Sequence, residues 1–139
     1  AKTVFEELII DKSRISQYEL ITSETFTSYG VCQFSFVKSI NGFNTNDTLS
    51  IAIDRDGKIK SYTGSRQGIF DNLTVNADRS DIEKFIDEKV NSRYKNQTVK
   101  YNVNSMTIDK KKNKFYIRCF VGVETEEYIT GDEYEYRLK

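Results

Sequence analysis

Histidine, tryptophan and proline are absent from this chain of 139 residues. Histidine is the commonest general base and metal ligand near neutral pH, so its absence excludes His-dependent triads, Cys–His dyads and His-ligated zinc within these residues. Asp54-Arg-Asp-Gly57 has part of a calcium-loop pattern, but Ala52 and Thr63 would fall where oxygen ligands are needed. We therefore predict a protein that is not an enzyme and that carries no metal and no cofactor.

An excess of one charge and a long apolar run are also missing. The 21 basic and 21 acidic side chains cancel formally, which removes the usual electrostatic argument for a nucleic-acid partner. No apolar run approaches the roughly 20 residues that a membrane-spanning helix requires. The sequence thus predicts no nucleic-acid partner and no membrane insertion by this segment, and it leaves the oligomeric state open.

Cysteine occurs only at Cys32 and Cys119. Both residues are in phase with large apolar neighbours on predicted strands, so both are expected to face the core. Two alternatives remain open: a disulfide between them if the chain is extracytoplasmic, or two free buried thiols that act as small hydrophobic groups. The free thiols are favoured, and no nucleophilic role is expected because no activating partner is near either residue in sequence.

The residues that are present describe a sheet. Leu49, Ile51 and Ile53 alternate with small or polar residues, which is the pattern of a half-buried strand. Asn41-Gly42 and Asp56-Gly57 flank this segment and supply the positive φ angles that tight hairpin turns require. Strand-like segments are predicted over 18–29, 31–40, 48–54 and 58–63.

One amphipathic helix is predicted over 79–94, with Asp78 or Ser80 as its N-cap. A shorter helix is predicted over 3–12, where Thr3 and Glu6 have capping-box spacing. The longer helix has a single apolar stripe at helical spacing, formed by Ile82, Phe85, Ile86 and Val90.

Three further strands are predicted after this helix. The first, over 99–108, changes phase at Asn104-Ser105, as a β-bulge would produce. Four lysines over 110–114 form the next turn, and Thr130–Asp132 turns the chain into the last strand. The middle strand has an inward row made by Phe115, Ile117, Cys119, Val121 and Val123.

Together these elements predict an α+β fold in which an antiparallel β-meander packs against one helix. We expect a single domain over 1–139. The order of helix, strands, helix and strands also fits a duplicated α-β-β-β unit, with halves over 1–76 and 77–139.

Candidate partner-contact residues are aromatic or apolar. The connection over 64–77 is longer than most connections in compact domains, which favours a binding loop with Ile69 and Phe70 as its candidate contact residues. Nine tyrosines are present, and tyrosine is enriched at binding surfaces because its ring buries area while its hydroxyl stays hydrated. Tyr62, Tyr134 and Tyr136 are the tyrosines proposed for this contact.

One longer sequence pattern, over residues 34–62, combines Phe34-Ser-Phe36, Asn41-Gly42, the alternating strand Leu49–Asp54, Asp56-Gly57 and Ser61-Tyr62. It resembles the PepSY group of domains and the related propeptide domains of thermolysin-type peptidases. The resemblance implies a bacterial domain outside the cytoplasm, secreted or anchored to the cell envelope, often within a lipoprotein. It also implies a non-catalytic role in binding or inhibiting peptidases.

The sequence therefore favours a non-enzymatic, extracytoplasmic protein-binding module that modulates a peptidase. An edge strand or a long loop suits this function, because either can recognise an extended peptide through main-chain hydrogen bonds without a residue motif. Two alternatives come from other classes. One is a structural spacer in a larger cell-envelope protein, and the other is a small-molecule-binding domain with an aromatic-lined pocket between helix and sheet.

Overall fold

The computed structural model describes residues 18–26, 30–65 and 68–139. Within these ranges it contains one helix and seven strands, which confirms an α+β fold with an antiparallel sheet. The elements are β1 (Tyr18–Phe26), β2 (Val31–Ile40), β3 (Phe43–Asp54), β4 (Ile59–Ser65), α2 (Arg79–Arg93), β5 (Val99–Lys111), β6 (Lys114–Thr125) and β7 (Ile129–Arg137).

The strands are hydrogen-bonded in the order β1-β2-β3-β5-β6-β7, and β4 pairs with β3. The helix predicted over 3–12 lies outside the described residues. No helix in the described part of the chain is long and apolar enough to cross a membrane.

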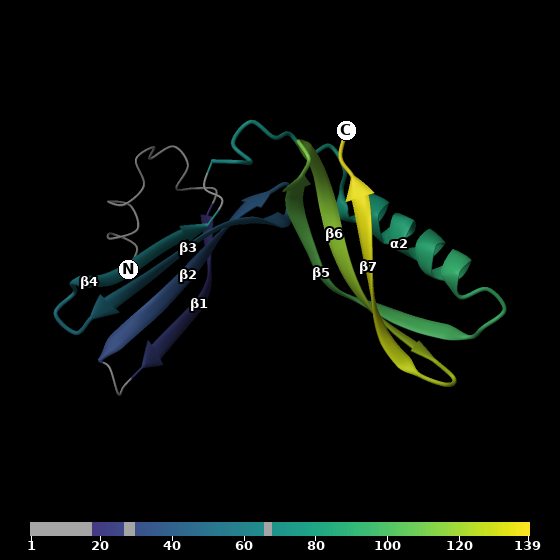
Figure 1. The fold of residues 1–139 in the computed structure, drawn as a ribbon, viewed down its shortest axis with the longest axis horizontal. Coiled ribbons are helices and arrows are strands. Elements are labelled where there is room, and N and C mark those ends of the chain that lie inside the picture. Colours follow the sequence, from purple (N-terminus) through teal and green to yellow (C-terminus); the bar gives the residue numbers. More distant parts are fainter. Residues whose placement is uncertain (1–17, 27–29, 66–67) are drawn as a thin grey trace. The chain divides into compact units, whose positions relative to one another are not determined.

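Contacts divide the chain into two compact units, which Figure 1 shows. The first unit holds β1, β2, β4 and most of β3. The second holds α2, β5, β6 and β7, together with the turn and strand start at Asn41–Asn44. Each unit has its own buried side chains, so each is described by itself.

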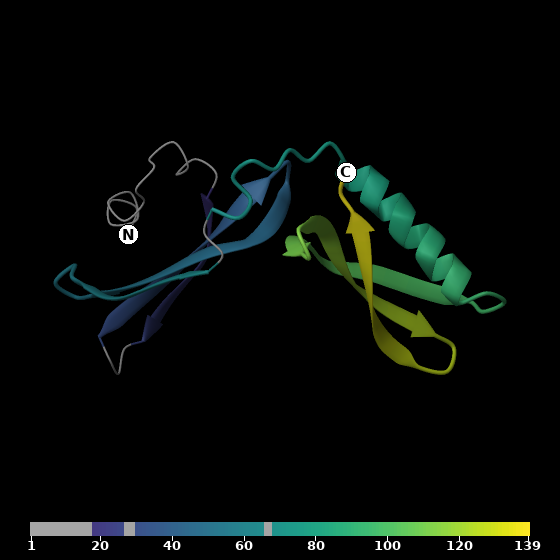
Figure 2. The ribbon, with the colours of Figure 1, turned by 45° about the horizontal axis from the view of Figure 1, so that its top comes forward.

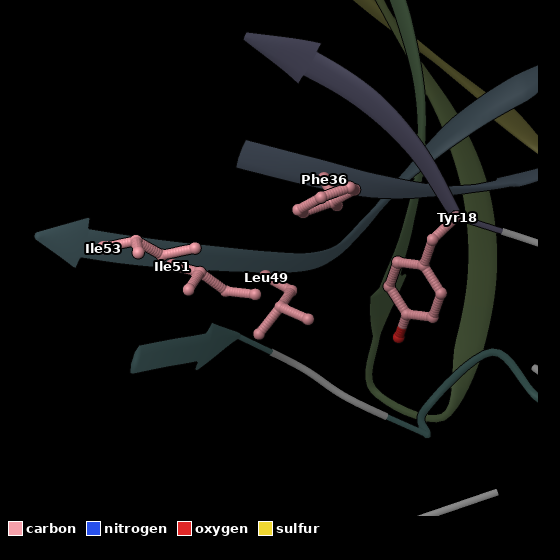
Figure 3. Packing of buried hydrophobic residues seen from close by; sticks show 5 residues of the cluster. All are labelled: Tyr18, Phe36, Leu49, Ile51 and Ile53. Atoms are coloured by element: carbon pink, nitrogen blue, oxygen red, sulfur yellow. The ribbon is translucent and has the colours of Figure 1, made fainter. Parts of the chain in front are cut away.

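The core of the first unit lies on one face of its strands. Leu49 and Ile51 of β3 are fully buried, and Phe36 of β2 is 7% exposed. Figure 3 shows these side chains with Tyr18 of β1 and Ile53 of β3. The alternation predicted for β3 is thus confirmed, because its apolar side chains share the buried face.

β3 begins at Phe43, five residues earlier than its predicted start at Thr48. Its buried face continues from Leu49 back through Asp47, Thr45 and Phe43, and all three of these side chains are buried. Hydropathy alone misses this extension because two of the inward positions are polar. The preceding turn is as predicted, with φ of 50° at Asn41 and 82° at Gly42.

The β3–β4 turn differs from its prediction. Only Gly57 has a positive φ, of 80°, whereas Asp56 has an ordinary backbone conformation. The carboxylate of Asp54 accepts hydrogen bonds from the backbone N–H groups of Asp56 and Lys58, both at 2.9 Å. These bonds stabilise a longer loop in place of a two-residue turn, because an aspartate side chain can take the role of a backbone acceptor.

The helix of the second unit begins at Arg79 as predicted, ends at Arg93, one residue before its predicted end, and has the predicted apolar stripe. Asp78 is its N-cap and forms a capping box with Asp81. Its stripe buries Ile82, Ile86 and Val90 completely. α2 runs along β7 over one face of the β5–β6–β7 sheet (Figures 1 and 2), where Phe85 meets the ring of Tyr136 edge-on at 5.2 Å.

The predicted bulge at Asn104 is confirmed, because the β5–β6 register shifts between Val103 and Ser105. Beside it, Asn102 pairs with Gly122, which in turn pairs with Gly131 of β7. The bulge of β5 thus lies next to a pair of opposite glycines, one in β6 and one in β7. Figure 1 shows that these long strands curve. Bulges and strand glycines are known means of bending a sheet.

The predicted turn at Thr130–Asp132 is wrong, because these residues belong to β7. The connection ends at Tyr128, whose carbonyl accepts a 2.9 Å hydrogen bond from the backbone N–H of Thr125. The turn was predicted because glycine is a typical turn residue, but Gly131 lies within β7, opposite Gly122 of β6. The lysine-rich turn is present, and its two central residues are Lys112 and Asn113, with φ of 51° and 62°.

Replacing Ile86 by Ala should lower the free energy of unfolding by about 3 kcal/mol, because the side chain is fully buried and its loss leaves a cavity. Urea unfolding followed by far-ultraviolet circular dichroism, which reports α2, measures this change. Glu88→Ala on the exposed side of the same helix is the matched control and should change it by less than about 0.5 kcal/mol. Equal losses in the two variants would contradict the assignment of the buried stripe.

Candidate functional site

A β-bulge in β4 aligns two large apolar side chains at the margin of the first unit. Ser61 pairs with Ala52, but the next pair joins Ile59 to Ile53, so Lys60 is an extra residue. Directly opposite residues of an antiparallel pair point to the same face. Because Tyr62 pairs with Ile51, the bulge places Ile59 and Tyr62 on the same face although they are three residues apart.

These two side chains extend the buried face of the first unit into solvent. Ile51 is fully buried and Ile53 is 8% exposed, whereas their cross-strand neighbours Tyr62 and Ile59 are 41% and 42% exposed. Within the described ranges, β4 has β3 as its strand partner. We name Ile59 and Tyr62 on this strand the β4 margin.

The turn beside the β4 margin is held in place by Asp54. Its carboxylate accepts two backbone hydrogen bonds and lies 3.5 Å from the Nζ of Lys60. The hydrogen bond from the backbone of Lys58 is the main cause that lowers the pKa of Asp54. A single carboxylate thus fixes both the loop and the bulged lysine, which pre-organises the adjoining strand.

The predicted binding loop exposes only one of its two predicted contact residues. Ile69 is 37% exposed, whereas Phe70 is fully buried. This burial contradicts the assignment of Phe70 to a contact surface, because its ring belongs to the interior. Substituting Phe70 would damage the fold in addition to any surface.

Buried polar groups explain why this loop packs inward. The Nζ of Lys38 lies 2.8 Å from Oδ1 of Asp71, and the backbone N–H of Gly68 donates to Oδ2 of Asp47 at 3.3 Å. Asp47 also accepts a 2.6 Å hydrogen bond from the hydroxyl of Tyr18. Lys38 and Asp47 are 1% and 0% exposed, and buried charges are tolerated only with such partners.

Sequence reasoning missed Lys38 and Asp47 as interior groups. Asp47 is in phase with Leu49, but a charged residue next to Asn46 suggests a solvated strand end. Lys38 is in phase with Phe36, and this phase was the only available signal. Their burial depends on partners that arrive from distant positions in the chain, which a local pattern does not contain.

Tyr134 and Tyr136, the other predicted contact residues, are half-buried and contact side chains of the second unit. The hydroxyl of Tyr134 donates to Asp132 at 3.0 Å, and the hydroxyl of Tyr94 donates to the same carboxylate at 2.7 Å. Arg93 lies 3.4 Å from the other oxygen of Asp132, which is 6% exposed. This cluster joins the end of α2 to β7, while Tyr136 packs against the helix.

Both cysteines are free thiols, but only Cys119 is buried as the sequence favoured. Cys32 belongs to the first unit and is half-buried, with its Sγ 3.6 Å from Oγ1 of Thr25. Cys119 belongs to the second unit and is fully buried. Burial raises the pKa of its thiol to about 11, which keeps it protonated near neutral pH.

Two surface cavities of the second unit are lined by described residues. One of about 260 Å³ is lined by Gly42, Phe43, Asn44, Arg79 and Val103–Thr107. The other, of about 430 Å³, is lined by Asn96–Thr98 and Glu126–Tyr128. Neither contains any of the predicted contact residues. Over the described ranges, no group of three or more His, Cys, Asp or Glu side chains is arranged to hold a metal ion.

The sequence matches no protein-family model, and no curated protein and no solved structure shows significant similarity to it.

Tyr94 should make stability pH-dependent in alkaline solution. Burial, followed by the hydrogen bond to Asp132, raises the pKa of its hydroxyl to about 12, above the value of about 10 in an unfolded chain. The stabilisation that this group provides is therefore complete below pH 10 and lost as the pH rises towards 12. Unfolding free energies across this interval should fall more steeply for the wild type than for Tyr94→Phe, and parallel curves would refute this assignment.

The two thiols should differ in reactivity. In Cys32→Ser, the remaining buried Cys119 should react with a thiol reagent at least about tenfold more slowly in the folded protein than in urea, because reaction needs local opening. In Cys119→Ala, the half-buried Cys32 should show a smaller ratio. Unfolded wild-type protein without reductant should yield two free thiols, whereas a yield of none would demonstrate a disulfide.

Proposed function

We propose that this chain is a non-enzymatic protein-binding module that engages an extended segment of another protein at the β4 margin. The observation that carries this proposal is the shared face of Ile59 and Tyr62. Both side chains are about two-fifths exposed beside fully or largely buried core residues. Exposed apolar groups that continue a core are typical of interaction surfaces.

An extended polypeptide is the partner that suits this geometry best. A strand at the margin of a sheet offers main-chain hydrogen-bonding groups, and its side chains select apolar residues at alternate positions of the added segment. Lys58 and Lys60 flank Ile59 and are exposed, and lysines and bulges on such strands hinder pairing between copies of the same chain. The favoured contact is therefore short and directed to a different protein.

The groups with the most perturbed chemistry support binding over catalysis. Tyr94 and Tyr134 are used in joining α2 to β7, and Cys119 is a protonated core thiol. Each of these groups has a structural role within the second unit, and the β4 margin belongs to the first unit.

The resemblance to PepSY domains suggests the class of partner. It supports an extracytoplasmic domain, secreted or envelope-anchored, whose target is a peptidase of the thermolysin type. The capping-box spacing of Thr3 and Glu6 supports a helix over 3–12, and with it we propose that residues 1–76 and 77–139 are diverged copies of an α-β-β-β unit. The β4 margin lies within the segment Phe34–Tyr62 that carries this resemblance and at its end.

Selection of random peptides on the immobilised protein tests the binding proposal. Selected peptides should be rich in alternating apolar residues, and Ile59→Ser or Tyr62→Ser should weaken their binding at least about tenfold, which corresponds to about 1.4 kcal/mol. Ile129→Ser is the matched control, because Ile129 is 80% exposed in the second unit, and it should leave binding unchanged. Circular dichroism establishes that each variant is folded.

Failure to select peptides, or equal binding by all variants, would overturn the β4 margin as the contact. The peptidase part is tested separately by adding the protein to a thermolysin-type peptidase and following hydrolysis of a chromogenic peptide. Inhibition that is lost in Tyr62→Ser would support it. Peptide binding without inhibition would contradict the peptidase as the target and would leave the proposal of a protein-binding module standing.

A further inference from the structure

The side chain of Asn41 anchors the segment that leads into α2. Its Nδ2 donates one hydrogen bond to the carbonyl of Val75 at 3.1 Å and another to the carbonyl of Ala77 at 3.0 Å. Both hydrogens of the amide are therefore used. Ala77 directly precedes Asp78, the N-cap of the helix, so the anchor lies at the beginning of α2 within the second unit.

The same asparagine precedes Gly42, and this is the only Asn-Gly pair in the chain. The absence of a side chain on glycine lets its backbone nitrogen approach the side chain of the preceding asparagine more easily than any other residue permits. Asn76 is followed by alanine, and Asn91 and Asn104 are each followed by serine, and these are the smallest side chains other than glycine that follow an asparagine in this sequence. Asn41 is thus the asparagine with the greatest intrinsic tendency to cyclise.

We propose that Asn41 is a site of spontaneous deamidation, whose rate the fold holds down and whose product releases the segment before α2. The backbone nitrogen of Gly42 attacks Cγ of Asn41, forms a carbon–nitrogen bond and loses its proton. The Cγ–Nδ2 bond breaks and ammonia leaves, which produces a five-membered succinimide. Water then opens the ring at either carbonyl to give aspartate or isoaspartate, so that water is consumed and ammonia is released.

The folded structure opposes the first step. Asn41 has a left-handed conformation with φ of 50°, fixed by the two-residue turn that joins β2 to β3. Its amide is also held by the carbonyls of Val75 and Ala77, which lie on another part of the chain. Cyclisation requires both constraints to be released, so it proceeds from a locally opened state.

The product cannot restore the anchor. A carboxylate at position 41 has no hydrogen to donate at neutral pH, and its oxygens would face the carbonyl oxygens of Val75 and Ala77. Isoaspartate would also lengthen the backbone of a turn that depends on positive φ at both of its central residues. The modification is therefore a one-way change that detaches the helix entry.

Incubation of the wild-type protein in mildly alkaline buffer, with and without an unfolding concentration of urea, tests this proposal by peptide mapping. In urea, the change from amide to acid should accumulate at Asn41 before Asn91 and Asn104. In the folded protein, it should be at least about tenfold slower, because opening must come first. Equal rates in the two states, or faster reaction at Asn91 or Asn104, would overturn the proposal.

The release of the helix entry has its own test. Amide hydrogen exchange of Val75–Asp81 should be faster in Asn41→Asp than in Asn41→Ala, because only the aspartate adds repulsion to the loss of the two hydrogen bonds. Equal exchange rates in the two variants would show that the carboxylate adds no repulsion to the loss of the two hydrogen bonds. If Asn41→Asp does not fold, the same measurement is made on wild-type protein that has been deamidated by incubation and isolated by charge.

Discussion

Strand register is the constraint on which both units depend. Successive side chains of a strand point to opposite faces, so a shift of one residue moves every following side chain to the other face. Register shifts occur in β1, β4 and β5, where one residue has no direct partner. In β4 the shift places Ile59 and Tyr62 on the same face of the strand, and in β5 it does the same for Val103 and Met106. The surface of one unit and the packing of the other are thus set by single inserted residues.

Buried carboxylates serve the two units in the same way. Asp47 accepts a tyrosine hydroxyl and a backbone N–H in the first unit, and Asp132 accepts two tyrosine hydroxyls in the second. Each carboxylate attaches a segment to a strand: the loop around Gly68 in one case and the end of α2 in the other. A buried charge that lost these partners would be strongly destabilising, so these attachments are specific.

The sequence predicted the parts of the fold that depend on local periodicity. The helix over 79–94 is recognisable because its apolar side chains recur at the helical spacing of 3.6 residues, whereas those of the strands alternate. The bulge at Asn104 is recognisable because the alternation of apolar side chains shifts there by one residue. The start of β3, the burial of Phe70 and the contacts of Tyr134 and Tyr136 within the second unit were not visible. The start of β3 depends on Asp47, whose polar partners come from distant segments, and a hydropathy pattern gives an inward aspartate the same weight as a solvated one. The contact of Tyr136 needs the ring of Phe85 on α2, which no pattern within β7 contains.

Interstrand nuclear Overhauser effects across β3 and β4 test the central claim most directly. The bulged register predicts cross-strand contacts of Ile59 with Ile53 and of Tyr62 with Ile51, and Lys60 should have no directly opposite residue. An uninterrupted register would instead place Lys60 opposite Ile53. That result would put Ile59 and Tyr62 on different faces and would remove the proposed contact surface.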